Sequence, residues 1–128
     1  MRAVLASCAL LVACAADPPA PPQFASTRWV GSADAGEPAH TPTLEFVNAD
    51  HIAGYTGCNM LSGQWHPEGD AVRISRVVIT KRACAGPGSD IERRVLAAIN
   101  DNSRVTREGN RLVAVGASGA RYEFSAAK

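Results

Sequence analysis

Short runs of alternating apolar and polar residues, separated by turn-forming residues, constrain the fold of this chain most strongly. In Thr43–Phe46, the apolar Leu44 and Phe46 alternate with polar residues, as in a strand with one buried face. The continuous β-branched run Val77–Ile79 predicts a fully buried strand. Other short runs predict further strands: Ile52–Tyr55, Leu61–Trp65, Val72–Ile74, Arg104–Arg107, Arg111–Val115 and Arg121–Phe124. Turn residues between these runs favour antiparallel neighbours.

One segment breaks this pattern and predicts a single helix of about three turns. Ile91, Val95 and Ile99 recur every fourth position and form one apolar stripe. Ser89 followed three residues later by Glu92 has the spelling of a capping box, which predicts Ser89 as the N-cap. The preceding Gly-Pro-Gly tripeptide predicts a loop. Because a lone helix needs a sheet to cover its stripe, we predict an α+β fold, with a mainly antiparallel curved sheet or partial β-barrel packed on one α-helix.

The N-terminus has the features of an export signal. Arg2 precedes an apolar run that ends at Ala13, too short for the ~20 residues that span a bilayer, so we predict a signal peptide over residues 1–13. The run ends in Leu-Val-Ala-Cys14, which resembles the bacterial lipobox. This resemblance implies cleavage before Cys14 and attachment of a lipid to its sulfur. An uncut apolar N-terminus is the alternative.

The residues after Cys14 indicate a spacer between a membrane and one folded domain. Four prolines in Ala15–Ala25 favour an extended tether, so we assign residues 14–25 to the lipidated cysteine and tether. The domain is expected over residues 26–128. Ala15 differs from the aspartate that would resemble an inner-membrane retention signal. We therefore expect a lipid-anchored protein of the bacterial cell envelope, at the outer membrane facing the periplasm.

Charge indicates no nucleic-acid partner. The chain has 13 Lys and Arg residues against 12 Asp and Glu, and loss of Arg2 with the signal leaves 12 against 12. A neutral protein lacks the electrostatic footprint that binds nucleic acid. Two basic pairs, Lys81-Arg82 and Arg93-Arg94, are interpreted as solvated surface. No phosphate-binding loop or recognisable catalytic motif is present, so we expect no enzyme and no cofactor.

Two cysteines remain after Cys14 and predict a disulfide. Cys58 and Cys84 form an even pair, and exported proteins meet an oxidising compartment. Two free thiols, a metal site or a catalytic cysteine are the open alternatives. The three histidines have no ligand spacing with one another or with these cysteines, so we expect no metal.

The order of these features resembles the META domain family, which includes the HslJ-like heat-inducible bacterial lipoproteins. The resemblance covers about Thr27–Phe124. A G-x-x-G-C-N motif lies at Gly54–Asn59, and the family's T-x-M-A-C motif lies at Thr80–Cys84. Arg82 stands where the family usually has methionine, so we expect that position to face solvent; Ile79 stands in place of a second threonine. The matching residues are Trp29, Gly54, Gly57, Cys58, Asn59, Thr80, Ala83 and Cys84.

The motif has a structural interpretation. Gly54 and Gly57 are expected to allow a tight bend, and Asn59 to bond nearby backbone. Cys58 and Cys84 would join that bend to the end of the buried strand.

Three functional hypotheses follow. The resemblance implies a non-enzymatic envelope lipoprotein linked to stress or antibiotic tolerance. The alternative is an envelope binding module for a lipid or peptide ligand. Its partner would be a protein or a small apolar molecule, and the sequence does not identify it. Its candidate contacts are Trp29, Tyr55, Trp65 and Tyr122. A weaker alternative is a lysozyme-inhibitor-like protein, because Ser118–Tyr122 resembles the S-G-x-x-Y element of that family; a hairpin turn explains it equally well.

Overall fold

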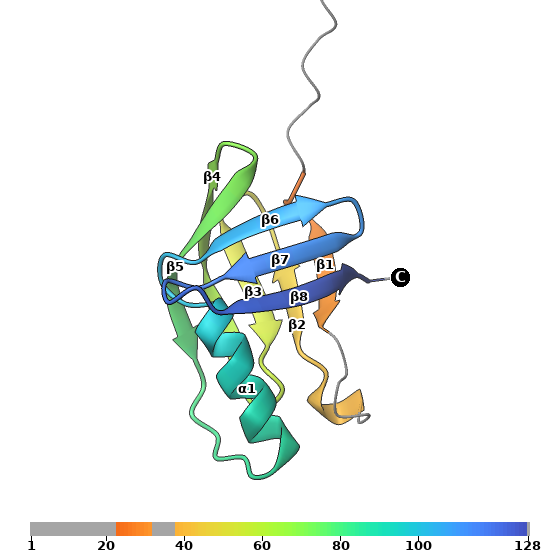
Figure 1. The fold of residues 1–128 in the computed structure, drawn as a ribbon, viewed down its shortest axis with the longest axis vertical. Helices are drawn as coiled ribbons and strands as arrows, with labels where there is room; N and C mark the ends of the chain where they lie inside the picture. Colours follow the sequence, from red (N-terminus) through yellow and green to blue (C-terminus); the bar gives the residue numbers. More distant parts are fainter. Residues whose placement is uncertain (1–22, 32–37, 128) are drawn as a thin grey trace, which may run out of the picture.

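A computed structural model describes residues 23–31 and 38–127, and these residues form eight antiparallel strands that close into a barrel with one α-helix. The predicted signal peptide, Cys14 and the tether as far as residue 22 lie outside the described residues. The elements follow in the order β1 (Thr27–Gly31), η1 (Pro38–His40), β2 (Thr43–Phe46), β3 (His51–Tyr55), β4 (Met60–Glu68), β5 (Ala71–Ile79), α1 (Pro87–Ala98), β6 (Arg104–Glu108), β7 (Arg111–Val115) and β8 (Arg121–Ala126), as Figure 1 shows.

Each strand pairs with the next along the chain, and β8 returns to pair with β1. Trp29 lies opposite Ala126 and Gly31 opposite Phe124. The predicted α+β class is therefore confirmed, but the partial barrel is closed. Local alternation could not indicate this closure, because it joins segments near the two ends of the domain.

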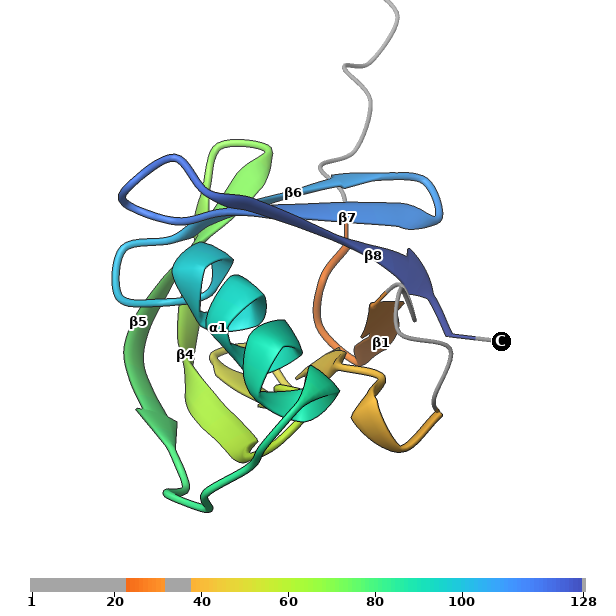
Figure 2. The ribbon, with the colours of Figure 1, turned by 60° about the horizontal axis from the view of Figure 1, so that its bottom comes forward.

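Helix α1 fills one end of the barrel (Figures 1 and 2). Ile91, Val95 and Ile99 are all buried, as the predicted stripe requires. A Cβ atom on Gly116 would lie 2.0 Å from the Ala97 carbonyl oxygen, so the β7–β8 turn approaches the helix closely only because residue 116 is glycine. Within the described residues, no helix is both long and apolar enough to cross a membrane.

The predicted start of the helix was wrong. Helix α1 begins at Pro87, with Gly86 as N-cap at φ 66° and no side-chain capping hydrogen bond. Proline is well suited to this first position, since its φ is fixed near the helical value and its missing N–H would have no helical partner. Ser89 is therefore inside the helix, and two residues of the expected loop form its first turn.

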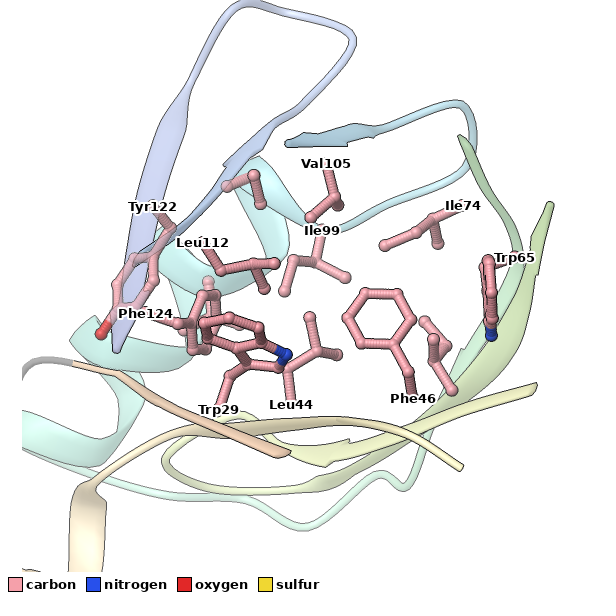
Figure 3. Close-up of a cluster of buried hydrophobic side chains, with 14 of the residues drawn as sticks. Trp29, Leu44, Phe46, Trp65, Ile74, Ile99, Val105, Leu112, Tyr122 and Phe124 are labelled. Atoms are coloured by element: carbon pink, nitrogen blue, oxygen red, sulfur yellow. The ribbon is translucent and has the colours of Figure 1, made fainter. Parts of the chain in front are cut away.

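The barrel interior is a single apolar core, shown in Figure 3. Phe24 belongs to it: the Phe24 ring centroid lies 5.3 Å from that of Phe46 and 6.1 Å from that of Trp65. The packed core thus begins two residues before Ser26, the expected first residue of the domain. The largest fully buried side chains are Trp29, Leu44, Phe46, Ile52, Val72, Ile74, Val95, Ile99, Val105, Leu112 and Phe124, together with Thr56.

Strand β5 departs from the predicted buried strand. Val78 is 63% exposed, and Val77 and Ile79 are only half-buried. The register between β4 and β5 shifts between Ser62 and Gln64, and Arg76 has a φ of 53° at this bulge. The bulge turns the second half of β5, so Val78 faces outward although the run is entirely β-branched.

Candidate functional site

The motif residues come together at the end of the barrel that α1 fills. The turn from β3 to β4 is closed by a hydrogen bond from Thr56 N to Asn59 O at 2.8 Å. The Thr56 hydroxyl oxygen also accepts from Cys58 N at 3.2 Å and from Asn59 N at 2.8 Å. Thr56 is completely buried, so this side chain holds the shape of the turn from within.

The two motif glycines have different roles. Gly57 has a φ of 101°, and a Cβ there would lie 2.8 Å from Ile91 Cγ2, so this turn both needs a left-handed residue and packs against α1. Gly54 lies inside β3, where a Cβ would lie 2.4 Å from Thr43 O. The expected bend is therefore confirmed for Gly57 and wrong for Gly54, whose glycine permits close contact with β2.

Asn59 uses every hydrogen-bonding position of its amide. Its Nδ2 donates to Glu92 Oε2 at 2.9 Å and to Arg82 O at 3.1 Å. Its Oδ1 accepts from Arg82 N at 2.6 Å and from Thr80 Oγ1 at 3.0 Å. The residue is only 3% exposed, and a buried amide is stable when all its groups are bonded. We call Thr56, Asn59, Thr80, Glu92 and the Arg82 backbone the Asn59 network.

Glu92 connects this network to the helix. Its Oε2 accepts from Thr56 Oγ1 at 2.5 Å as well as from Asn59. Sequence reasoning placed Glu92 at the helix start as a capping residue, and it missed Thr56. No local signal identifies this pair, because the partners lie 36 positions apart.

The disulfide lies beside the Asn59 network. Cys58 and Cys84 are bonded, with a Cα–Cα separation of 6.0 Å, as the even cysteine pair predicted. Thr80 Oγ1 accepts from Met60 N at 3.0 Å, so the chain beyond β5 is also fixed to the start of β4. The Cys58–Cys84 disulfide joins the β3–β4 turn to the loop between β5 and α1.

The Arg82 departure from the family motif is accommodated because the fold uses only its backbone. Asn59 binds the N–H and the carbonyl of residue 82. The Arg82 side chain is exposed, as expected, and so is Ala83. An arginine in place of methionine therefore leaves the Asn59 network intact.

The aromatic candidates for ligand contact serve mainly in packing. Trp29, Trp65 and Tyr122 are buried, at 1%, 6% and 6% exposure. Trp29 Nε1 donates to Thr27 Oγ1 at 2.9 Å, and the Arg107 guanidinium carbon lies 5.0 Å from the centre of the Trp29 ring. Tyr55 is partly exposed and donates its hydroxyl proton to Ala39 O at 3.1 Å.

Ser118–Tyr122 covers the second half of the β7–β8 turn and the first two residues of β8. Gly116 N donates to Ala120 O at 2.9 Å, and Gly119 N donates to Gly116 O at 2.9 Å. The Tyr122 ring lies 5.0 Å from the Phe124 ring in the core. A hairpin turn therefore accounts for the S-G-x-x-Y spelling.

Among the hollows on the described surface, two are lined largely by apolar side chains. One, of about 410 Å³, lies at the barrel end where the chain enters, beside Phe24, Trp65 and Val72. The other, of about 390 Å³, lies between β5 and α1 and is lined by Val77, Ile79, Leu96, Ile99, Asn100 and Asp101. Among residues 23–31 and 38–127, no group of three or more metal-ligating side chains is gathered.

The comparison with known families follows the same residues. The META domain profile matches residues 22–128. The chain belongs to the META domain family. A Burkholderia xenovorans protein solved by NMR has 25% identity to this META domain chain and a TM-score of 0.59, with 82% of this chain and 84% of that one covered. A second NMR structure has 17% identity and a TM-score of 0.57, with 83% and 93% covered, and shows the fold alone. No curated protein matches the chain.

Proposed function

We propose that this META domain protein is a non-enzymatic, lipid-anchored lipoprotein of the bacterial envelope, of the HslJ-like kind, that supports tolerance of stress or antibiotics. Family membership supports an envelope-associated protein. We propose a non-enzymatic protein because the polar groups of the motif are bonded within the fold. Asn59 has both donors and both acceptor positions bonded within the domain, so the signature residues stabilise the barrel rather than present a reactive group.

The anchor is proposed from the lipobox-like end at Cys14. Residues 14–22 can reach at most about 30 Å, which keeps the barrel close to the bilayer. The Cys58–Cys84 disulfide supports an oxidising compartment such as the periplasm. Two or more acyl chains give a stable attachment.

Metabolic labelling with an alkyne palmitate analogue tests the anchor. Cys8 lies inside the predicted signal peptide and provides the control. Wild-type protein and Cys8→Ser are expected to carry label and to sediment with outer membranes, while Cys14→Ser is expected to lose both properties. Label that persists on Cys14→Ser, or wild-type protein without label, would refute the proposed anchor.

The tolerance role is tested by deleting the gene in the native bacterium and measuring survival under heat and envelope-active antibiotics. Deletion is expected to lower survival, and wild-type protein to restore it. Asn59→Ala is expected to restore survival only to the extent that folded protein accumulates. A folded, abundant Asn59→Ala protein with no rescue would instead identify a direct chemical role for Asn59.

A second candidate is a binding module for a peptide or lipid. The observation that favours it is the hollow between β5 and α1, where the apolar side chains of Val77, Ile79 and Leu96 are only half-buried. This candidate is compatible with the lipid anchor, since a tethered barrel could hold a partner near the membrane.

A further inference from the structure

Strand β5 has a strand neighbour on both sides only along its first part. Residues Ala71, Val72 and Arg73 pair with β6, whereas the pairing with β4 continues from Ala71 to Ile79. Beyond the bulge at Arg76, β6 has diverged and α1 occupies the space beside β5 (Figures 1 and 2). The second part of β5 therefore has a sheet edge on the side away from β4.

The hydrogen-bonding direction along this edge follows from its neighbours. Thr80 N donates to Met60 O at 3.1 Å, toward β4. Backbone hydrogen-bonding directions alternate along an antiparallel strand. The N–H and carbonyl of Val78 therefore also point toward β4, whereas those of Val77 and Ile79 point away from it. Val77 N is bonded to Asp101 Oδ1 at 2.8 Å, on this outward side.

Three backbone groups on this side are thus left to a partner: the Val77 carbonyl and the N–H and carbonyl of Ile79. Among residues 23–31 and 38–127, none of the turn, loop and side-chain hydrogen bonds involves these three groups, and the pairing with β6 ends at Arg73. We call the Val77–Ile79 backbone the β5 edge. An exposed edge of this kind is a template for another strand.

The hollow of about 390 Å³ runs beside the β5 edge. Val77 and Ile79 share one face of the strand and line the hollow, since side chains two positions apart point the same way. Leu96 of α1, together with Ile99, Asn100 and Asp101 that follow it in the chain, lines the rest of the hollow. The Asn100 side chain is fixed there by bonds to Leu96 O and Ala97 O at 2.9 and 3.0 Å. We call this hollow the β5–α1 groove.

We propose that the β5 edge binds an acidic, extended segment of a partner protein, which adds a strand to the barrel and places alternate apolar side chains in the β5–α1 groove. The backbone groups define an extended chain, and the half-buried apolar walls define its alternate residues. Charge defines its flanks: Arg76 precedes the edge, Lys81 and Arg82 follow it, and all three are exposed. Asp101, the acidic group at the groove, already accepts from Val77 N.

The probe is a displayed library of random twelve-residue peptides, selected on the mature chain from residue 14 with Cys14→Ser to keep it in solution. Enriched sequences are expected to alternate apolar residues and to carry Asp or Glu. Amide hydrogen exchange should show Ile79 N–H exchanging rapidly in the free protein and slowly with peptide bound. A library without enrichment above background, or bound peptides that leave the Ile79 amide unprotected, would overturn the proposal.

Ile79→Pro removes the outward N–H without touching a bond to β4, and proline is tolerated at sheet edges. Loss of that hydrogen bond is expected to weaken peptide binding about tenfold. The matched control Ile79→Val keeps the N–H and should bind within about twofold of wild type, as should Val78→Thr on the opposite face. Equal binding by Ile79→Pro would contradict strand addition.

Two further measurements remain decisive if Ile79→Pro does not fold. Leu96→Asp leaves the strand intact and places a carboxylate in the groove wall, so it should weaken binding of acidic peptides by about tenfold or more. Analytical ultracentrifugation addresses a second copy as the occupant. Concentration-dependent dimers that protect the Ile79 amide would assign the β5 edge to self-association and overturn the peptide proposal.

Discussion

Thr56 donates its hydroxyl proton to Glu92 Oε2 at 2.5 Å, and the two residues lie 36 positions apart. This contact fixes the helix to the turn between β3 and β4, and Asn59 donates to the same carboxylate oxygen. Thr56→Val is expected to lower the free energy of unfolding by about 2–3 kcal/mol, because it removes this bond and leaves two backbone N–H groups without an acceptor.

A double-mutant cycle measures how strongly these two residues depend on each other. Urea denaturation of Thr56→Val, Glu92→Gln and the double variant should give a coupling energy on the order of 1–2 kcal/mol. Arg93 follows Glu92 in the helix and is exposed. Its substitution Arg93→Gln serves as the control and should change the free energy of unfolding by less than about 0.5 kcal/mol. Strict additivity of the two changes would show that the contact contributes nothing.

The Cys58–Cys84 disulfide should be a major source of stability. It closes a loop with a sequence separation of 26, which corresponds to about 3.5 kcal/mol in the chain-entropy description. Cys58→Ser/Cys84→Ser should lose roughly this amount in urea denaturation. Reductant should destabilise wild-type protein similarly and leave the double variant unchanged; a wild-type midpoint insensitive to reductant would contradict the prediction.

The bulge in β5 should carry backbone strain at Arg76, whose φ is 53°. Arg76→Gly is expected to raise the free energy of unfolding by about 0.5–1 kcal/mol, because glycine adopts positive φ without a Cβ clash. Ser75→Gly, at the preceding strand position, should instead destabilise by about 0.5–1 kcal/mol. Thermal denaturation of both variants distinguishes relief of strain from a general effect of glycine, which would lower both midpoints.

Glu68 provides a pH-dependent contact at the β4–β5 hairpin. Its carboxylate accepts from Arg73 Nε and Nη2 at 2.8 and 2.7 Å, and these bonds hold the pKa of Glu68 below its ordinary value of 4.5. Because the pKa of Glu68 is lower in the folded than in the unfolded state, Glu68 stabilises the fold at pH values above its unfolded-state pKa. This contribution is lost as the pH falls through the folded-state pKa. NMR titration should show the lowered pKa in wild type and its return toward 4.5 in Arg73→Ala; an unchanged pKa in that variant would exclude Arg73 as the cause.

The strands were predictable from sequence where alternation and burial are local. Leu44 and Phe46 are both completely buried, as their spacing indicated. Where a strand departs from regular geometry, the same reasoning failed: the bulge at Arg76 exposes Val78, which composition alone had placed in the core. Barrel closure was also beyond reach, because the pairing of β1 with β8 depends on the whole chain.

The candidate site was predictable only in part, for a related physical reason. The cysteine pair and the turn at Gly57 follow from residue type, and the structure confirms both. The local pattern of Ser89 followed three residues later by Glu92 predicts that Glu92 belongs to a helix cap. In the fold its carboxylate serves Thr56 and Asn59 instead, and a local pattern cannot indicate such distant partners.

The META motif stabilises the barrel through Asn59. Urea denaturation of wild type and Asn59→Ala, both with the disulfide intact, measures this contribution. The alanine removes the side-chain hydrogen bonds of Asn59 to Glu92, Thr80 and the Arg82 backbone from a buried site, so we predict a loss of about 2–4 kcal/mol in the free energy of unfolding. A change below about 0.5 kcal/mol would contradict the claim.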